Sequence, residues 1–392
     1  FVNVSERFHG RSYQAKHVMF DLEASSTLNC AKECCFNHQQ IKPFRYYLYQ
    51  EKKLIENKCI SNMGSFSFES NQLLNMTRTY NPDRASAFII PLMYSIADTK
   101  ACFEWYKGLP YWNIKGKPGL NHIFWSVSDL EINPRFRANH LGFAALAQGH
   151  SNRSHFINGL DISVSLRGGG KGPQSTTSIS SSVQRIKRIA GYERKWLLTF
   201  KGTGDNIDRF KAVTEFSNIS DVLIIDRPKF CLPHINKMWK NDECCTIIEK
   251  YYSSFPYENI LNTTFSLIVS GTSPATFRLH EVLESQSIPV FFDYDNFILP
   301  YEDIINWSEI SLTITENDDI TSIIEVLKEL RSDTARIIRM QQRISEIYEN
   351  HFHTRNYMDS LAGVIQTLQR RCDFGENSFS QHRIRVGCSS DT

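Results

Sequence analysis

One segment of this chain, residues 265–307, restricts its fold more than any other. An apolar run over 265–269 predicts a strand, a short amphipathic helix follows, and a second apolar run over 288–292 predicts another strand. Strand, turn, helix and strand within about thirty residues form one Rossmann-like unit. The first turn of such a helix offers unpaired N–H groups and a positive dipole end, which favour a phosphate.

Two charged residues stand on this predicted helix. Arg278 and Glu281 are three positions apart, so they share one helix face near its N-terminal end. A cation for a diphosphate and a carboxylate for ribose hydroxyls suit a nucleotide-sugar site. A surface ion pair with no ligand fits the same spacing, and the spacing alone does not decide between them.

Length and charge limit the class of protein. A chain of 392 residues predicts two domains of ordinary size, each with its own core. The formal net charge of +2 argues against nucleic acid as an obligate partner. The sequence contains no apolar run of eighteen or more residues, so we expect no membrane span within the chain as given.

Cysteines and glycosylation sequons favour the secretory pathway. Ten cysteines are plentiful for a reduced enzyme, and no paired set at zinc-ligand spacing occurs, so disulfides are expected. We predict a bridge involving Cys30 and Cys35 in an irregular lead-in, and a second from Cys231 to either Cys244 or Cys245. The N-x-S/T sequons that support this compartment are Asn3, Asn75, Asn152, Asn218, Asn262 and Asn306.

Strand and helix patterns alternate on both sides of a polar run at residues 167–182. Before it we expect a helix at 141–148 and strands at 44–49, 85–92, 121–125 and 162–166. After it we expect strands at 196–200 and 222–226, the 265–307 unit, and helices at 320–330, 332–348 and 357–368. The pattern predicts an α/β protein with a lead-in (1–40), an N-terminal lobe (41–190), a C-terminal lobe (191–345) and a C-terminal helix with tail (346–392). Ligands are expected in the crevice between the lobes.

Two short motifs resemble ligand-binding signatures, but a loop without a ligand is the simpler interpretation of each. Gly168-Gly169-Gly170 suggests a phosphate loop, but the spacing of a P-loop is absent, so a flexible linker is favoured. Asp293-Tyr294-Asp295 spells the D-x-D manganese signature of another transferase fold. It falls in a predicted loop of this chain, so we expect no metal there. Trp307 is interpreted as core packing rather than as a platform for a sugar.

Several motifs in order along residues 30–370 resemble one known family. They include Phe277-Arg278-Leu279-x-Glu281, Ile288-Pro289-Val290, Leu299-Pro300, Ile305-Asn306-Trp307, Asn121-His122-Ile123-Phe124, Phe200-Lys201-Gly202 and Leu261-Asn262-x-Thr264-Phe265. This series resembles the exostosins, glycosyltransferase family 47. The likeness is strongest to the animal members that polymerise heparan sulfate.

The resemblance implies a GT-B fold, with two Rossmann-like lobes around a central cleft. It implies a UDP-sugar donor held mainly by the C-terminal lobe without a catalytic metal, and inverting transfer of glucuronic acid to heparan chains ending in N-acetylglucosamine. It also implies Golgi or endoplasmic reticulum residence through a type II anchor outside this chain, and a heterodimer with a second exostosin. Only a short tail follows the family-47 region here, so the second transferase domain of those members is not expected.

Site residues follow from the same resemblance. Arg278 is the candidate for binding the donor diphosphate and Glu281 for the ribose, and Gly271 and Lys201 are further candidates for binding the donor. His122 and Asp161 are expected near strand ends facing the cleft, as a base or as acceptor contacts. The alternative for these last two is a hydrogen-bonded residue that orients a loop.

The chain departs from the family where positive charge is expected. Ser270-Gly271-Thr272-Ser273 stands in place of an Arg-Gly-Arg-Arg run, Leu120 in place of an arginine, and Thr203-Gly204 in place of a basic pair. The absence of one charge-assisted hydrogen bond to the donor costs about 1.5–3 kcal/mol of binding free energy. Lys195, Lys201 or a partner chain could compensate for these missing charges.

Three functions therefore remain open. The first is a supporting subunit with a weakened donor site, and the second is an active inverting glucuronosyltransferase. The third, a lectin-like binder of glycosaminoglycan, is least favoured because the sequence has no dense basic stripe.

Overall fold

The computed structural model describes residues 43–49, 71–92, 106–114, 117–126, 141–149, 151–166, 178–204, 207–217, 219–228, 231, 243–270, 276–292, 297–315, 317–352 and 357–373. The predicted lead-in with Cys30 and Cys35, the Gly168–Gly170 segment, Gly271 and the Asp293–Asp295 motif lie outside these residues.

Five parallel strands form the first sheet, and they are neighbours in chain order. They are β1 (Tyr46–Leu48), β2 (Ala87–Leu92), β5 (His122–Ser126), β6 (Ala145–Gln148) and β7 (Ile162–Ser163). A short antiparallel pair, β3 (Asn113–Ile114) with β4 (Lys117–Pro118), and helix α3 (Gln72–Thr77) accompany them. Alternate side chains of these strands enter two separate apolar clusters, so both faces of the sheet are buried.

Two segments differ from the sequence prediction. The helix expected at 141–148 is wrong, because Ala145–Gln148 forms strand β6 between β5 and β7. A short run of small apolar residues buried on both faces does not reveal its period. The polar run at 167–182 was expected to be a linker, yet its end belongs to helix α6 (Ser178–Lys187). That helix contributes Val183 and Ile186 to a small apolar cluster with Leu261.

The second sheet is also fully parallel, but its strand order changes direction. The order is β12 (Leu312–Ile314), β11 (Ile288–Phe292), β10 (Thr263–Val269), β8 (Trp196–Gly204) and β9 (Val222–Pro228). Its helices are α7 (Ile207–Phe216), α8 (Glu243–Ser253), α9 (Tyr257–Leu261), α10 (Phe277–Glu284), α11 (Ile320–Ser332) and α12 (Thr334–His351). The chain passes from β8 to β9 on one side and then to β10 on the other. A topological switch point therefore lies between β8 and β10.

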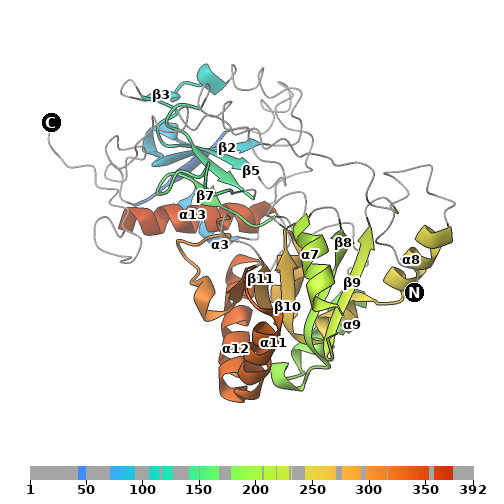
Figure 1. Ribbon diagram of the computed structural model, residues 1–392. Helices are drawn as coiled ribbons and strands as arrows, with labels where there is room; N and C mark the ends of the chain where they lie inside the picture. Colours follow the sequence, from blue (N-terminus) through green and yellow to red (C-terminus); the bar gives the residue numbers. More distant parts are fainter. Residues whose placement is uncertain are drawn as a thin grey trace.

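The predicted two-lobed α/β fold is confirmed (Figure 1). The last helix among the described residues, α13 (Tyr357–Asp373), does not stay with the second sheet but runs along the first, near α3. Within it, Arg371 donates to the carbonyls of Leu160 and Asp161 in the first lobe and to Asp303 Oδ2 in the second. The end of the described chain thus ties the two lobes together.

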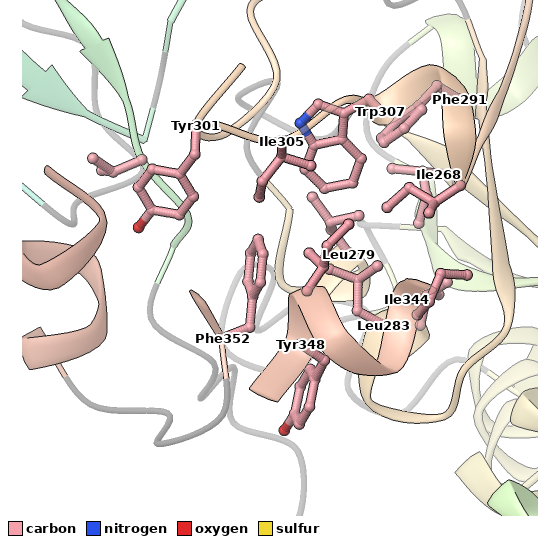
Figure 2. Packing of buried hydrophobic residues seen from close by; sticks show 14 of the residues in the cluster. Ile268, Leu279, Leu283, Phe291, Tyr301, Ile305, Trp307, Ile344, Tyr348 and Phe352 are labelled. Atoms are coloured by element: carbon pink, nitrogen blue, oxygen red, sulfur yellow. The ribbon is translucent and has the colours of Figure 1, made fainter. Parts of the chain in front are cut away.

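A loop after β11 joins the lobes through an aromatic cluster (Figure 2). Trp307 is 6% exposed, donates its Nε1–H to Pro300 O at 2.9 Å, and packs edge-on against Phe291. The loop also reaches the first lobe, since Tyr301 N donates to Ser163 O at 2.8 Å. Trp307 is therefore core packing, as predicted, and it fixes the loop between the lobes.

Candidate functional site at the switch point of the second sheet

Ligands of open parallel sheets bind outside the carboxyl ends of the strands, at the switch point. In this chain that place is defined by the ends of β8 and β10 and by the first turn of α10. Helix α10 begins after Thr276, whose side chain accepts a hydrogen bond from Arg278 N at 3.2 Å. Arg278 is consequently fixed at the edge where the sheet meets this helix.

Arg278 and Glu281 come together as the sequence predicted. Nη1 of Arg278 lies 2.7 Å from Glu281 Oε2, and Nη2 donates to the backbone carbonyl of Lys201 in β8. The Arg278 side chain is 11% exposed, so it lies neither in the apolar core nor in bulk solvent. Arg278 and Glu281 therefore form an ion pair, as the interpretation without a ligand also expects. The pair lies at the switch point rather than on an open helix surface.

Lys201, in β8, places a second cation beside Arg278. Its Nζ donates to Phe255 O at 2.6 Å and lies 4.2 Å from the ring centroid of Tyr252. Burial lowers the pKa of the Lys201 amine to about 8, and the positive charges of Arg278 and Arg227 act in the same direction. Lys201 is thus held close to two other cations.

Two more arginines reach this edge, and neither was among the residues predicted from the sequence. Arg227 lies near the carboxyl end of β9 and pairs through Nη1 with both carboxylate oxygens of Glu249, each at 2.8 Å. Arg209, from α7, donates through Nε to Ser270 O at 2.9 Å and through Nη1 to Thr203 O at 2.5 Å. A basic residue two positions beyond the apolar run at 222–225, at the carboxyl end of a predicted strand, was a signal that could have identified Arg227.

Lys195 cannot compensate for the missing arginines within this site. It precedes β8, so it lies at the amino edge of the sheet, opposite the switch point. Its Nζ stands 4.7 Å from the ring of Trp196. Of the two lysines considered from the sequence, only Lys201 lies beside Arg278.

A small pocket between the lobes lies beside the start of α10, close in sequence to Arg278. The first lobe contributes residues that follow β6 and β7, and the second contributes the start of α10 and the loop after β11. Its lining is mostly apolar and comprises Gly149, Val164, Ser165, Leu166, Thr276, Leu279, His280, Phe291, Phe297, Ile298, Leu299, Pro300 and Phe352. The carboxyl ends of strands from both lobes therefore face one pocket.

His122 does not face this pocket. It is the first residue of β5, at the amino end of the strand, and it is fully buried. Nδ1 lies 3.0 Å from Leu120 O, Nε2 lies 3.1 Å from Tyr49 Oη, and the ring stacks on Phe88 at 4.8 Å. Desolvation by burial lowers the pKa of His122 to about 4. Its expected position at the cleft is wrong, and its interactions are those of a core residue.

Asp161 is also held away from the pocket edge. It precedes β7, and its carboxylate accepts hydrogen bonds from Leu146 N and Ile157 N, both at 2.9 Å. These bonds join the turn before β7 to strand β6. The expected position facing the cleft is therefore wrong for Asp161 too. The catalytic roles suggested for it and for His122 stay predictions that these hydrogen bonds do not favour.

A disulfide bond stabilises the region beside Arg227. It joins Cys231, just after β9, to Cys245 in α8. This is one of the two pairings that the sequence left open, and the alternative pairing of Cys231 with Cys244 is wrong. The bond attaches α8, which carries Glu249 and Tyr252, to the end of β9.

The sequons differ in exposure. Asn75 on α3 and Asn306 before Trp307 are exposed, whereas Asn152 and Asn262 are half-buried. Asn3 and Asn218 lie outside the described residues. Glycosylation at each of these sites stays a prediction.

Comparison with known proteins decides the family. The Exostosin GT47 domain matches residues 36–330, which is most of the chain. The chain belongs to the exostosin GT47 family. Similar exostosins include Exostosin-1c of Danio rerio (25% identical over 375 residues, 87% of this chain and 45% of the relative) and Exostosin-1 of Drosophila melanogaster (24% over 352 residues, 83% and 43%). The Exostosin-1 homolog of Caenorhabditis elegans is 26% identical over 261 residues, 64% of this chain and 62% of the relative.

The chain spans less than half the length of the first two of these exostosins. Among the residues that the structure describes, no helix is long and apolar enough to cross a membrane. The same described part of the chain holds no group of three or more metal-ligating side chains.

Proposed function

We propose that this exostosin-family chain is a subunit of a heparan sulfate elongating complex, acting beside a second exostosin chain, with a weakened UDP-sugar site of its own. The observation that carries the proposal is the position of Arg278. Its guanidinium is fixed at the switch point by Lys201 O and Glu281, where a donor diphosphate binds in open parallel sheets. The site is recognisable, but its cations already have protein partners.

Charge balance supports a weak rather than an absent donor site. Lys201, Arg227 and Arg278 interact with Glu249 and Glu281, and Arg209 reaches the same edge. Four cations therefore stand against two carboxylates, and two net positive charges remain among these six residues. UDP-glucuronate carries about three negative charges. An incoming diphosphate must also compete with the Glu281 carboxylate for Arg278. We therefore expect low donor affinity and a supporting role. The proposed complex acts in the lumen of the secretory pathway.

The alternative is an active inverting glucuronosyltransferase that uses UDP-glucuronate. It is favoured by the convergence of Arg227 and Lys201 on the same edge as Arg278, which restores part of the positive charge that the motif lacks. A base for the acceptor hydroxyl is still required for this function. Neither His122 nor Asp161 lies at the pocket, so this alternative has less support.

One experiment separates the two functions. The chain is purified alone and with a second exostosin, then incubated with UDP-glucuronate and an oligosaccharide ending in N-acetylglucosamine. Arg278→Ala is compared with Arg343→Ala, an exposed arginine on α12 that also pairs with carboxylates. Transfer is measured from radiolabelled donor, and assembly is measured by size-exclusion chromatography.

For a supporting subunit, the complex should transfer glucuronate more efficiently than the partner alone, and Arg278→Ala should leave that gain intact. Loss of transfer in Arg278→Ala, with Arg343→Ala unaffected and the complex assembled, would establish this chain as the catalyst. If the chain neither assembles with a second exostosin nor changes its transfer rate, the subunit proposal is wrong.

A further inference from the structure

Arg227 stands beside the donor site although no expected motif includes it. In the register of β8 and β9, Thr203 pairs with Arg227, and Lys201 lies two residues before Thr203. Side chains two residues apart on a strand share a face, so Arg227 and Lys201 point to the same side of the sheet. Both stand over one aromatic ring, since Arg227 Cζ and Lys201 Nζ lie 4.3 and 4.2 Å from the Tyr252 centroid.

Within the part of the chain that the structure describes, the hydrogen bonds of the Arg227 guanidinium come from one of its nitrogens. Nη1 donates both hydrogen bonds to the Glu249 carboxylate. Nε is buried and has no hydrogen-bond partner among the described residues. A buried N–H without a partner is costly, whereas the Nε–Nη2 edge is suited to two oxygens of a phosphate. The unused edge thus favours an anionic ligand.

The position of Arg227 is fixed by three groups. Glu249 holds Nη1, the Tyr252 ring lies against the guanidinium, and the Cys231–Cys245 disulfide attaches their helix α8 to the end of β9. A guanidinium held in this way loses little conformational freedom on binding a ligand. The Arg227 side chain is 19% exposed although Nε itself is covered, so an anion reaches the exposed part of the guanidinium first. Use of Nε then requires a small shift of the groups that cover it.

We propose that Arg227 is an anion-binding residue of the donor site, which receives the diphosphate of a nucleoside diphosphate sugar through its Nε–Nη2 edge. Tyr252 and Glu249 are positioning residues that hold it. Arg227 takes over part of the charge that the Ser270–Ser273 segment lacks. The inference rests on the proposed function only in placing a UDP-sugar at the switch point.

Binding to the full chain tests the proposal without requiring turnover. UDP, UDP-glucuronate and free glucuronate are titrated by ligand-observed NMR into the wild type and into Arg227→Gln, Arg227→Lys and Arg278→Ala. Arg343→Gln is the matched control, because it removes an arginine that pairs with carboxylates away from the site. The melting temperature of each variant is measured by circular dichroism. If Arg227→Gln melts at a lower temperature than the wild type, Arg227→Lys is used to test the proposal instead.

Arg227→Gln should weaken binding of UDP and UDP-glucuronate alike, by about ten- to hundredfold. Arg227→Lys should weaken both by less, because the charge stays and the two-donor edge is lost. Arg343→Gln should match the wild type. Tyr252→Leu should reduce affinity and Tyr252→Phe should restore it, because the aromatic ring rather than the hydroxyl positions Arg227.

Three results would overturn the assignment in distinguishable ways. If Arg278→Ala weakens UDP binding and Arg227→Gln does not, Arg227 has no part in the site, and the proposed function is unaffected. If Arg227→Gln weakens only UDP-glucuronate, Arg227 faces the sugar carboxylate and the diphosphate assignment is wrong. If neither arginine affects UDP binding, the donor site itself is misplaced.

Discussion

The indole Nε1 of Trp125, in strand β5, donates a hydrogen bond of 3.0 Å to the hydroxyl of Ser360 in α13. Both residues are buried, and 235 positions of the chain separate them. The bond shows that α13, which follows the second lobe in sequence, completes the packing of the first. The two lobes are therefore not independent in their stability, although each has its own sheet.

Ser360→Ala should destabilise the protein by about 1–3 kcal/mol, because the buried Trp125 N–H loses its acceptor. Urea denaturation measures the free energy of unfolding. Ser332→Ala removes an exposed serine whose hydroxyl bonds only its own helix, and it serves as the matched control. Equal stability of the two variants would show that the Trp125–Ser360 bond makes no net contribution.

The stability of the protein should fall as the pH drops below about 6.5, in part because of His122. Burial depresses the folded-state pKa of His122 to about 4 against 6.5 in the unfolded chain, so the unfolded state binds the extra proton between these values. This residue should account for about 3 kcal/mol of lost stability, complete near pH 4. Urea midpoints from pH 7 to 4 should show a shallower slope in His122→Gln.

Glu281→Ala should change the affinity for UDP and the affinity for pyrophosphate in different ways. Removing the carboxylate takes away the expected partner of the ribose, and it also frees Arg278 from its ion pair. Affinity for UDP should therefore fall, whereas affinity for inorganic pyrophosphate should hold or rise. NMR titrations of both ligands provide the measurement, with the exposed Glu329→Ala as control. A parallel loss for both ligands would mean that Glu281 acts only by orienting Arg278.

UDP binding should weaken as the pH rises through about 8. Desolvation, reinforced by Arg278 and Arg227, lowers the pKa of Lys201 to about 8, so this amine loses its charge above that pH while the arginines keep theirs. Lys201→Arg should retain affinity at pH 9. Comparing each titration with that variant separates the lysine from ionisation of the nucleotide. An identical pH profile in both proteins would exclude Lys201 from the site.

Much of the fold could be predicted because its signals are local. Apolar runs of five to seven residues in β10 and β11 and the amphipathic period of α11 and α12 are properties of short segments. The region at 141–148 was predicted wrongly as a helix, because its small apolar side chains are buried on both faces and carry no period.

The site was predictable only where family motifs contain it. Arg278 and Glu281 share a helix turn, so their meeting follows from spacing. Arg227 and Lys201 meet over Tyr252 because β8 and β9 are paired and α8 folds back onto them, a relationship that no local pattern contains. The positions of His122 and Asp161 could have been predicted correctly, because the expected strands at 121–125 and 162–166 put both residues at amino ends, whereas ligands bind outside the carboxyl ends.

The sequence by itself determined that this chain is an α/β protein of the exostosin family, with fewer arginines at its donor motif than the family expects. These properties depend on the order and type of neighbouring residues. Only the tertiary structure decided which charges converge at the switch point, which vicinal cysteine pairs with Cys231, and which polar residues are buried as core. Each of these outcomes depends on interactions between segments far apart in the chain, which are set by how the sheets and helices pack rather than by local sequence.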